Sequence, residues 1–205
     1  MVPSVRHVAP LALALVLSVS ANAFAQSSDV GVGLKVGGNR ATTGGADVPT
    51  NVKAINGLTG GAFVSMTFGP SVGIQVEALF SQKGVGAFDG RDKTRLTVTY
   101  VDIPILLKVG KFGDKSASGG HVFVGPVVGL KVGAKATFND TEITTFKDSD
   151  VRGLDLGITA GVGVNVGAIG LDARYTMGLR TIDSFANPDD IKNRVVSLIA
   201  SYRFK

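Results

Sequence analysis

The sequence predicts an all-β protein: an eight-stranded antiparallel up-and-down transmembrane β-barrel. Its main support is a strict two-residue alternation that recurs about eight times and is clearest over residues 154–166, where even positions are apolar and odd positions are Gly, Thr, Asn or Asp. Such a segment has one apolar and one small polar face, and its length suits a tilted membrane strand of about 9–11 residues plus its ends. No run of 18 apolar residues follows residue 25, so no membrane-spanning helix is expected.

The first 25 residues have the pattern of a secretory signal peptide. Arg6 and His7 precede an apolar stretch over 8–19, and Ala23-Phe24-Ala25 forms a small-x-small cleavage site before Gln26. The apolar stretch is shorter than the ~20 residues that an uncleaved helical anchor needs. We therefore divide the chain into a signal peptide, 1–25, and a barrel domain, 26–205.

The composition excludes several classes of protein. Without Arg6, 20 basic residues stand against 16 acidic ones, a formal charge of +4, and no basic run suggests a nucleic-acid partner. The chain has no Cys, so its stability in an oxidising compartment must come from a closed backbone network and from packing. Its 28 Gly residues follow no collagen-like period.

Alternation places the first four strands at 30–39, 58–68, 72–80 and about 95–109. In each, the apolar residues at every second position are assigned to the lipid face. This outward set is Val30, Val32, Leu34, Val36, Ala62, Val64, Met66, Phe68, Val72, Ile74, Val76, Ala78, Phe80, Val101, Ile103, Ile105 and Leu107. Pro104 cannot donate a hydrogen bond to a neighbouring strand, so a bulge or local bend is expected there.

The last four strands are predicted at 121–132, 154–166, 169–179 and 195–204. Beyond the even positions of 154–166, their outward residues are Val122, Val124, Val128, Leu130, Val132, Leu171, Ala173, Tyr175, Met177, Leu179, Val196, Leu198, Ala200, Tyr202 and Phe204. Long connections are expected at 40–57, 81–94, 133–152 and 180–194. Shorter ones are expected at 69–71, 110–120 and 167–168. This alternation of long extracellular loops and short periplasmic turns is typical of bacterial barrels, and it leaves both termini on the periplasmic side.

Charged residues occupy the opposite, inward face of the strands. They are Lys35, Glu77, Asp102, Lys108, Lys131, Asp155, Asp172, Arg174, Arg180 and Arg203. Because a buried charge without a partner is very costly, these residues are expected to pair and fill the lumen. A soluble eight-stranded barrel of the lipocalin kind would reverse the two faces, but the polar face here is too rich in Gly, and too poor in Lys and Glu, for a solvated exterior.

Four segments resemble a family of small outer-membrane barrels that includes PorT-like and OmpA-like proteins. GVGLKVGGN at 31–39 resembles the opening strand of that family, YVDIPILLK at 100–108 its fourth strand, FVGPVVG at 123–129 its fifth, and LDARYTMGL at 171–179 its seventh. The resemblance spans nearly all of 26–205 and implies an eight-stranded barrel in the bacterial outer membrane, without a general catalytic site. Such barrels often end on an aromatic residue, whereas here Phe204 is followed by Lys205.

No constellation of residues predicts catalysis, so no catalytic, cofactor or metal residues are assigned and the protein is not expected to be an enzyme. His121 is interpreted as a solvated residue at the periplasmic rim, because no spacing points to a nucleophile beside it. Glu77, Asp102, Asp155 and Asp172 could form a catalytic cluster or proton relay, but pairing with Lys and Arg is the simpler interpretation. The acids Asp140, Glu142, Asp148 and Asp150 lack the order of a calcium loop.

The function that the sequence favours is a structural role in the bacterial envelope or an interaction made through the long loops. A narrow or gated porin is the alternative, and an enzyme acting on envelope lipid is the third possibility. The expected partners are outer-membrane lipid, the barrel assembly machinery, which would read Tyr202 and Phe204 in the C-terminal strand, and an unidentified extracellular ligand of the loops. No nucleic acid or cofactor is expected, and the barrel is expected to be a monomer.

Overall fold

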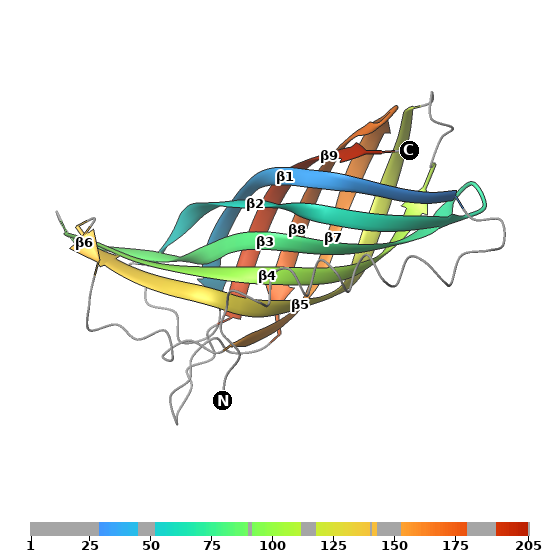
Figure 1. Cartoon of the computed structure of the whole chain (residues 1–205). Coiled ribbons are helices and arrows are strands. Elements are labelled where there is room, and N and C mark those ends of the chain that lie inside the picture. The colour runs from blue at the N-terminus through green and yellow to red at the C-terminus, as the bar shows by residue number, and fades with distance from the viewer. Residues whose placement is uncertain are drawn as a thin grey trace.

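A computed structural model describes residues 29–44, 52–89, 92–111, 118–139, 141–142, 153–179 and 192–204. All regular structure in these ranges is β-strand (Figure 1). The strands are β1 Asp29–Gly44, β2 Val52–Phe68, β3 Val72–Asp89, β4 Asp92–Gly110, β5 Ser118–Phe138, β6 Thr141–Glu142, β7 Leu154–Val166, β8 Ile169–Gly178 and β9 Lys192–Arg203. Within the described ranges, no helix is long and apolar enough to cross a membrane. The predicted signal peptide, 1–25, lies outside these ranges.

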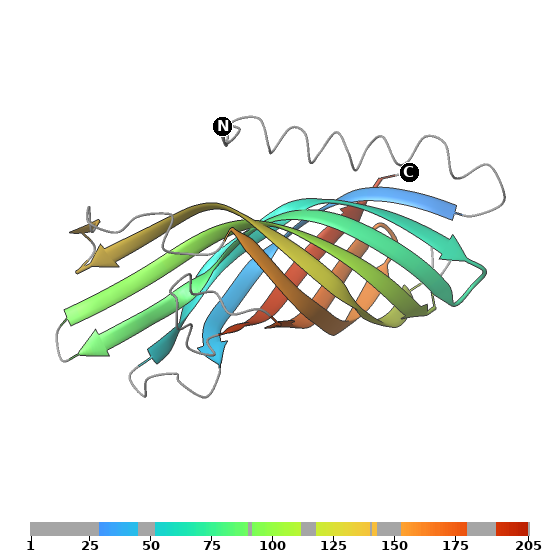
Figure 2. The same cartoon turned by 90° about the horizontal axis from the view of Figure 1, so that it is seen from below.

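Eight of these strands close into an antiparallel barrel. The order is β4-β3-β2-β1-β9-β8-β7-β5, and pairing of β4 with β5 closes the ring. β6 has two residues and only extends β5, through the pairs Thr137–Glu142 and Phe138–Thr141. Figure 2 shows the tilted strands wrapping around a common axis. The predicted fold class is therefore confirmed.

The exposed surface of the barrel is apolar and its interior is polar, which is the reverse of a soluble protein. Val36, Val122 and Val162 are 67 %, 55 % and 57 % exposed, whereas Lys35 and Glu77 are 4 % and 0 % exposed. Only a surface that faces lipid makes this arrangement favourable, because hydrocarbon solvates apolar side chains and cannot solvate charged ones. The assignment of the two faces is confirmed, and a soluble lipocalin-like barrel is excluded.

Several connections are shorter than the sequence suggested. The expected long loop 81–94 is wrong: β3 continues to Asp89 and β4 begins at Asp92, so the two strands pair along almost all of this segment. β1 likewise continues to Gly44, β2 begins at Val52 and β5 reaches Phe138. The short turns at 69–71 and 167–168 are confirmed, with Gly69 and Gly167 at φ of 66° and 60°, a conformation that glycine adopts without steric cost.

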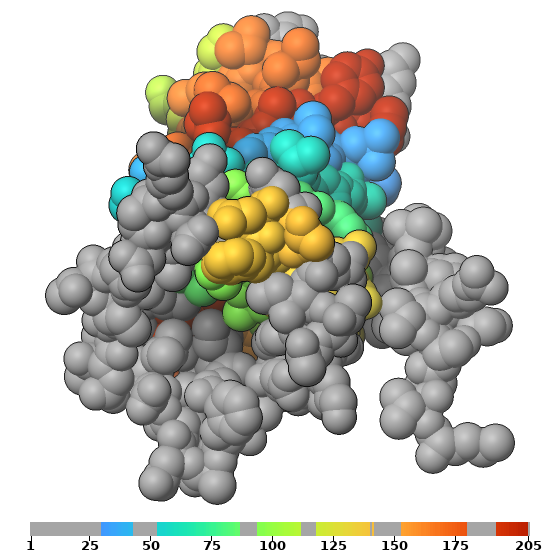
Figure 3. All heavy atoms as spheres, turned by 90° about the vertical axis from the view of Figure 1, so that its left-hand side faces the viewer, coloured from blue at the N-terminus to red at the C-terminus, as the bar shows by residue number. Residues whose placement is uncertain are grey.

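The strands differ in length, so one wall of the barrel is taller than the other. β3, β4 and β5 have 18, 19 and 21 residues, whereas β8 and β9 have 10 and 12. The extra length lies at the end that carries β6, which we assign to the extracellular side because the short turns lie at the opposite end (Figure 1). Seen from this end, the yellow atoms of β5 and β6 lie below the blue, orange and red atoms of β1, β8 and β9 (Figure 3).

Pro104 lies in β4 without the bulge that the sequence suggested. Its side chain is fully buried in the lumen, and β4 pairs with β3 in one register on both sides of it. The pairing to β3 simply skips Ile103 and Pro104. The register between β4 and β5 instead shifts between Thr99 and Tyr100, where Val132 is the extra residue. A proline is therefore accommodated by the loss of ladder bonds alone, in a strand held by both neighbours.

Candidate functional site

The candidate site is the polar interior of the barrel, and its centre is a four-residue ion-pair network. Lys35 Nζ of β1 donates to Glu77 Oε1 of β3 at 2.7 Å and to Asp172 Oδ2 of β8 at 2.6 Å. Arg174 of β8 binds both oxygens of Glu77, at 2.8 and 3.1 Å, and lies 3.4 Å from Asp172 Oδ2. The side chains in this central network are at most 5 % exposed. Two cations and two carboxylates thus connect opposite walls of the lumen.

Neutral side chains extend the central network toward the periplasmic end. Gln75 donates to Glu77 Oε1 at 2.6 Å and accepts from Lys108 Nζ at 3.1 Å. His121 Nε2 lies 3.2 Å from Asp172 Oδ1, and its Nδ1 lies 3.4 Å from Asn165 Nδ2. Polar contacts therefore run without a break from the middle of the barrel to its periplasmic mouth.

The expectation that His121 is a solvated rim residue is wrong. The residue is 5 % exposed and its side chain is completely buried beside Asp172. The reason is that β5 begins at Ser118, three residues before His121, so the histidine lies inside the mouth rather than on its edge. The sequence signal was position parity, because His121 alternates with the outward Val122 and Val124 and therefore faces the lumen.

A second cluster fills the extracellular half of the lumen. Lys83 Nζ of β3 lies 2.8 Å from Asp102 Oδ1 of β4 and 3.6 Å from Asp155 Oδ2 of β7. Asn193 of β9 donates to Asp155 Oδ2 at 2.8 Å. Sequence reasoning missed Lys83 because it assigned the residue to a loop. The position parity would have found it, since Lys83 follows Glu77, Leu79 and Ser81 at intervals of two.

Aromatic rings separate and support the charged clusters. Each of the three rings lies beneath a cation: Phe63 beneath Lys35 at 5.5 Å, Phe123 beneath Arg174 at 5.3 Å, and Tyr100 beneath Lys83 at 4.8 Å, measured to the ring centroids. These rings are at most 4 % exposed and face the lumen rather than lipid. Cation–π attraction adds to charge pairing in such a desolvated space. The interior is consequently packed with both apolar and polar side chains.

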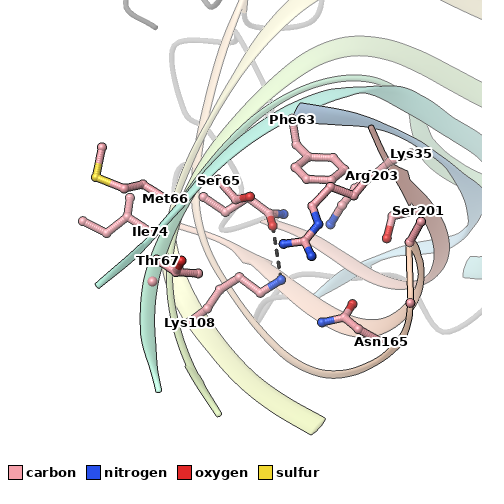
Figure 4. A pocket seen from close by; sticks show the side chains of 14 residues that line it. Lys35, Phe63, Ser65, Met66, Thr67, Ile74, Lys108, Asn165, Ser201 and Arg203 are labelled. Carbon is pink, nitrogen blue, oxygen red and sulfur yellow. Dashed lines mark hydrogen bonds between the residues drawn. The ribbon is translucent and has the colours of Figure 1, made fainter. Parts of the chain in front are cut away.

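Little space remains between these side chains. A cavity of about 50 Å³ lies at the periplasmic mouth, where Lys108 and Arg203 point into it (Figure 4). A second cavity of about 20 Å³ lies in the extracellular half, beside Asn39, Ser81 and Lys83. The central network separates these two cavities: Lys35 lines the first and Arg174 the second.

Comparison with known proteins identifies the family. Residues 24–184 match the model of the family described as outer membrane protein beta-barrel domain. The chain belongs to this family. It is a bacterial outer-membrane barrel, in agreement with its apolar exterior and polar interior. β9, which lies beyond the matched range, pairs with both β1 and β8 and completes the ring.

Three solved structures are similar to the chain, and the first of them supports the same fold. Neisserial surface protein A is 12 % identical over 87 % of this chain and 100 % of its own, with a TM-score of 0.50. The attachment invasion locus protein Ail of Yersinia pestis, solved with the heparin analogue sucrose octasulfate, is 13 % identical over 86 % of this chain and 99 % of its own, at 0.44. The outer membrane enzyme PagL is 12 % identical over 82 % and 98 %, at 0.41. No curated protein matches the chain.

The other sequence-predicted residues of this outer-membrane barrel are placed as follows. Glu77, Asp102, Asp155 and Asp172 are all buried in the lumen, and each lies within 4 Å of a Lys or Arg nitrogen. Pairing, rather than a cluster of acids, is what the geometry shows. Lys131 and Arg203 are half-buried, and Arg180 lies outside the described residues.

The acidic loop carries no described site. Asp140, Asp148 and Asp150 lie outside the described ranges, and only the backbone of Glu142 is described, in β6. Across the part of the chain that the structure describes, no group of three His, Cys, Asp or Glu side chains could hold a metal ion.

Proposed function

We propose that this outer-membrane barrel has a structural or loop-mediated interaction role in the bacterial envelope and does not conduct solutes. The observation that carries the proposal is the filled lumen. Ion pairs cross it at the level of Glu77 and Asp172, and the two cavities within it, one at the periplasmic mouth and one between the central network and Lys83, amount to about 50 and 20 Å³. An eight-stranded barrel has an interior just wide enough for side chains to fill, and here they fill it.

The tall wall supports the interaction half of the proposal. β3, β4 and β5 extend beyond β7 and β8 at the extracellular end, which carries paired backbone away from the membrane (Figure 1). A rigid projection of this kind presents the adjoining loops to partners outside the cell, and loops on rigid scaffolds are where binding residues concentrate. We further propose that residues 1–25 are removed on export and that assembly reads the exposed aromatic pair Tyr202 and Phe204, whose rings are 5.5 Å apart.

Single-channel recording of the refolded protein tests the proposal against the porin alternative. The purified barrel, reconstituted in planar bilayers, should show little or no steady conductance, because continuous ion pairing leaves no connected water column. Reproducible openings on the nanosiemens scale in the wild-type protein would instead make transport the leading function. A refolded porin recorded in the same bilayers is the positive control.

A further inference from the structure

Lys108 is a buried cation that the central network does not neutralise. It is 9 % exposed, and Gln75 Oε1, a neutral acceptor, is its hydrogen-bond partner at 3.1 Å. The four carboxylate oxygens of Glu77 and Asp172 are already contacted by Lys35, Arg174, Gln75 and His121. Three cations, Lys35, Lys108 and Arg174, therefore share two carboxylates. A lysine ammonium has three donors, so two donors of Lys108 remain for a group outside the network.

A second cation faces Lys108 across the mouth. Arg203 projects from β9, which lies opposite β4 in the ring, and both side chains point into the same cavity (Figure 4). Asn165 and Ser201 also line this space and offer amide and hydroxyl donors, whereas the Ser65 hydroxyl donates to the Gly31 carbonyl. Two cations and several neutral donors around one cavity are complementary to an anion, since charge-assisted hydrogen bonds to oxyanions are the strong ones.

The size of the cavity limits what it can hold. At about 50 Å³ it would hold roughly three to five waters, given about 10–15 Å³ for each, or one tetrahedral oxyanion in their place. Its lining includes Gly167 and Ala168 of the β7–β8 turn, so it reaches the periplasmic surface. The periplasmic turns of such barrels adjoin the headgroup region of the inner leaflet, which contains the phospholipid phosphates.

We propose that the periplasmic mouth is an oxyanion-binding site in which Lys108 and Arg203 hold a phosphate group, either free or as the headgroup of an inner-leaflet phospholipid. This goes beyond the structural or interactive role proposed above and does not depend on it. The bound group supplies the negative charge that the network around Lys108 lacks.

Calorimetric titration of the barrel in a neutral detergent tests the site with inorganic phosphate, against sodium chloride at equal ionic strength. Wild-type protein should bind phosphate and not chloride. Lys108→Met and Arg203→Gln should each weaken phosphate binding by about tenfold or more, the effect of losing one charged hydrogen bond. Lys108→Arg should retain binding. Arg40→Gln, an exposed charge near the opposite end of β1, is the matched control and should bind as the wild type does.

A second arm distinguishes the two sources of phosphate. In nanodiscs of phosphatidylethanolamine and phosphatidylglycerol, continued phosphate binding assigns the site to a free ion. Loss of binding there, with binding retained in detergent, assigns it to the headgroup. Absence of phosphate binding by the wild type in detergent, or equal weakening by Arg40→Gln and Lys108→Met, would overturn the proposal.

Discussion

Single glycines on the inner face determine where the buried side chains fit. An added Cβ at Gly163 of β7 would lie 2.5 Å from His121 Nε2, and one at Gly161 would lie 2.5 Å from Phe123 Cζ. Real Cβ atoms do not approach other heavy atoms so closely, so each glycine leaves space for the larger side chain paired with it on the adjacent strand β5. The abundance of Gly on the polar face, evident in the sequence, therefore reflects close packing inside the barrel.

Gly163→Ala should destabilise the barrel by about 1–3 kcal/mol, because the added methyl overpacks the space beside His121 and Asp172. Guanidinium unfolding followed by circular dichroism measures the effect, since the chain has no Trp for fluorescence. Gly133→Ala in β5 is the matched control: its Cβ would meet nothing within 4 Å, and the substitution should be neutral or slightly stabilising. Equal losses of stability in the two variants would contradict the conclusion that close contacts with His121 and Asp172 cause the loss at Gly163.

Which residues face the lumen could be predicted from the sequence, whereas the ion pairs that they form could not. Position parity alone assigned Lys35, Glu77, Asp172 and Arg174 to the inner face, and the structure confirms it. Which acid meets which base depends on strand order, register and tilt, and Lys35 reaches Asp172 across 137 residues of sequence. No local pattern encodes such a distance.

At the scale of the element, β7 shows how completely alternation separates the two faces. Val162 is 57 % exposed, whereas Thr159 is 1 % exposed and its hydroxyl accepts from Thr176 at 2.9 Å. Val162→Arg should block insertion or cost about 2–4 kcal/mol, because it places a charge in the hydrocarbon layer near its midplane. Thr159→Ser keeps the hydroxyl and should be nearly neutral. Refolding yield into lipid vesicles measures both, and an arginine tolerated as well as the serine would contradict the assignment of the faces.

The boundaries of the strands were harder to predict from the sequence than the strands themselves. Each of the eight predicted segments lies largely within a barrel strand, but the hairpin of β3 and β4 was cut short. Its outer part contains Gly84, at φ 149°, and Gly86, which interrupt the apolar alternation. Antiparallel pairing nevertheless continues there, because the backbone ladder needs no particular side chain once the two strands are aligned.

The whole molecule is held by a closed ring of hydrogen-bonded strands, without any cysteine. A closed ring has no edge to fray, and its backbone groups are satisfied within the barrel. The protein should therefore stay in the outer-membrane fraction after carbonate washing, and it should migrate differently on gels before and after boiling in detergent. A protein that carbonate releases from the membrane, or one that migrates identically with and without boiling, would contradict insertion as a closed barrel.

Removal of one central cation tests whether the filled lumen acts as a plug or as a gate. Arg174→Ala takes away the two hydrogen bonds to Glu77, and because Glu77 is 0 % exposed the loss should cost about 3 kcal/mol in guanidinium unfolding. Conductance should nevertheless stay near zero, since Lys35 still joins Glu77 to Asp172 across the lumen. Arg194→Ala, an exposed residue of β9, is the matched control and should change neither quantity. A variant that keeps wild-type stability yet conducts steadily would identify Arg174 as a gating residue and the barrel as a channel.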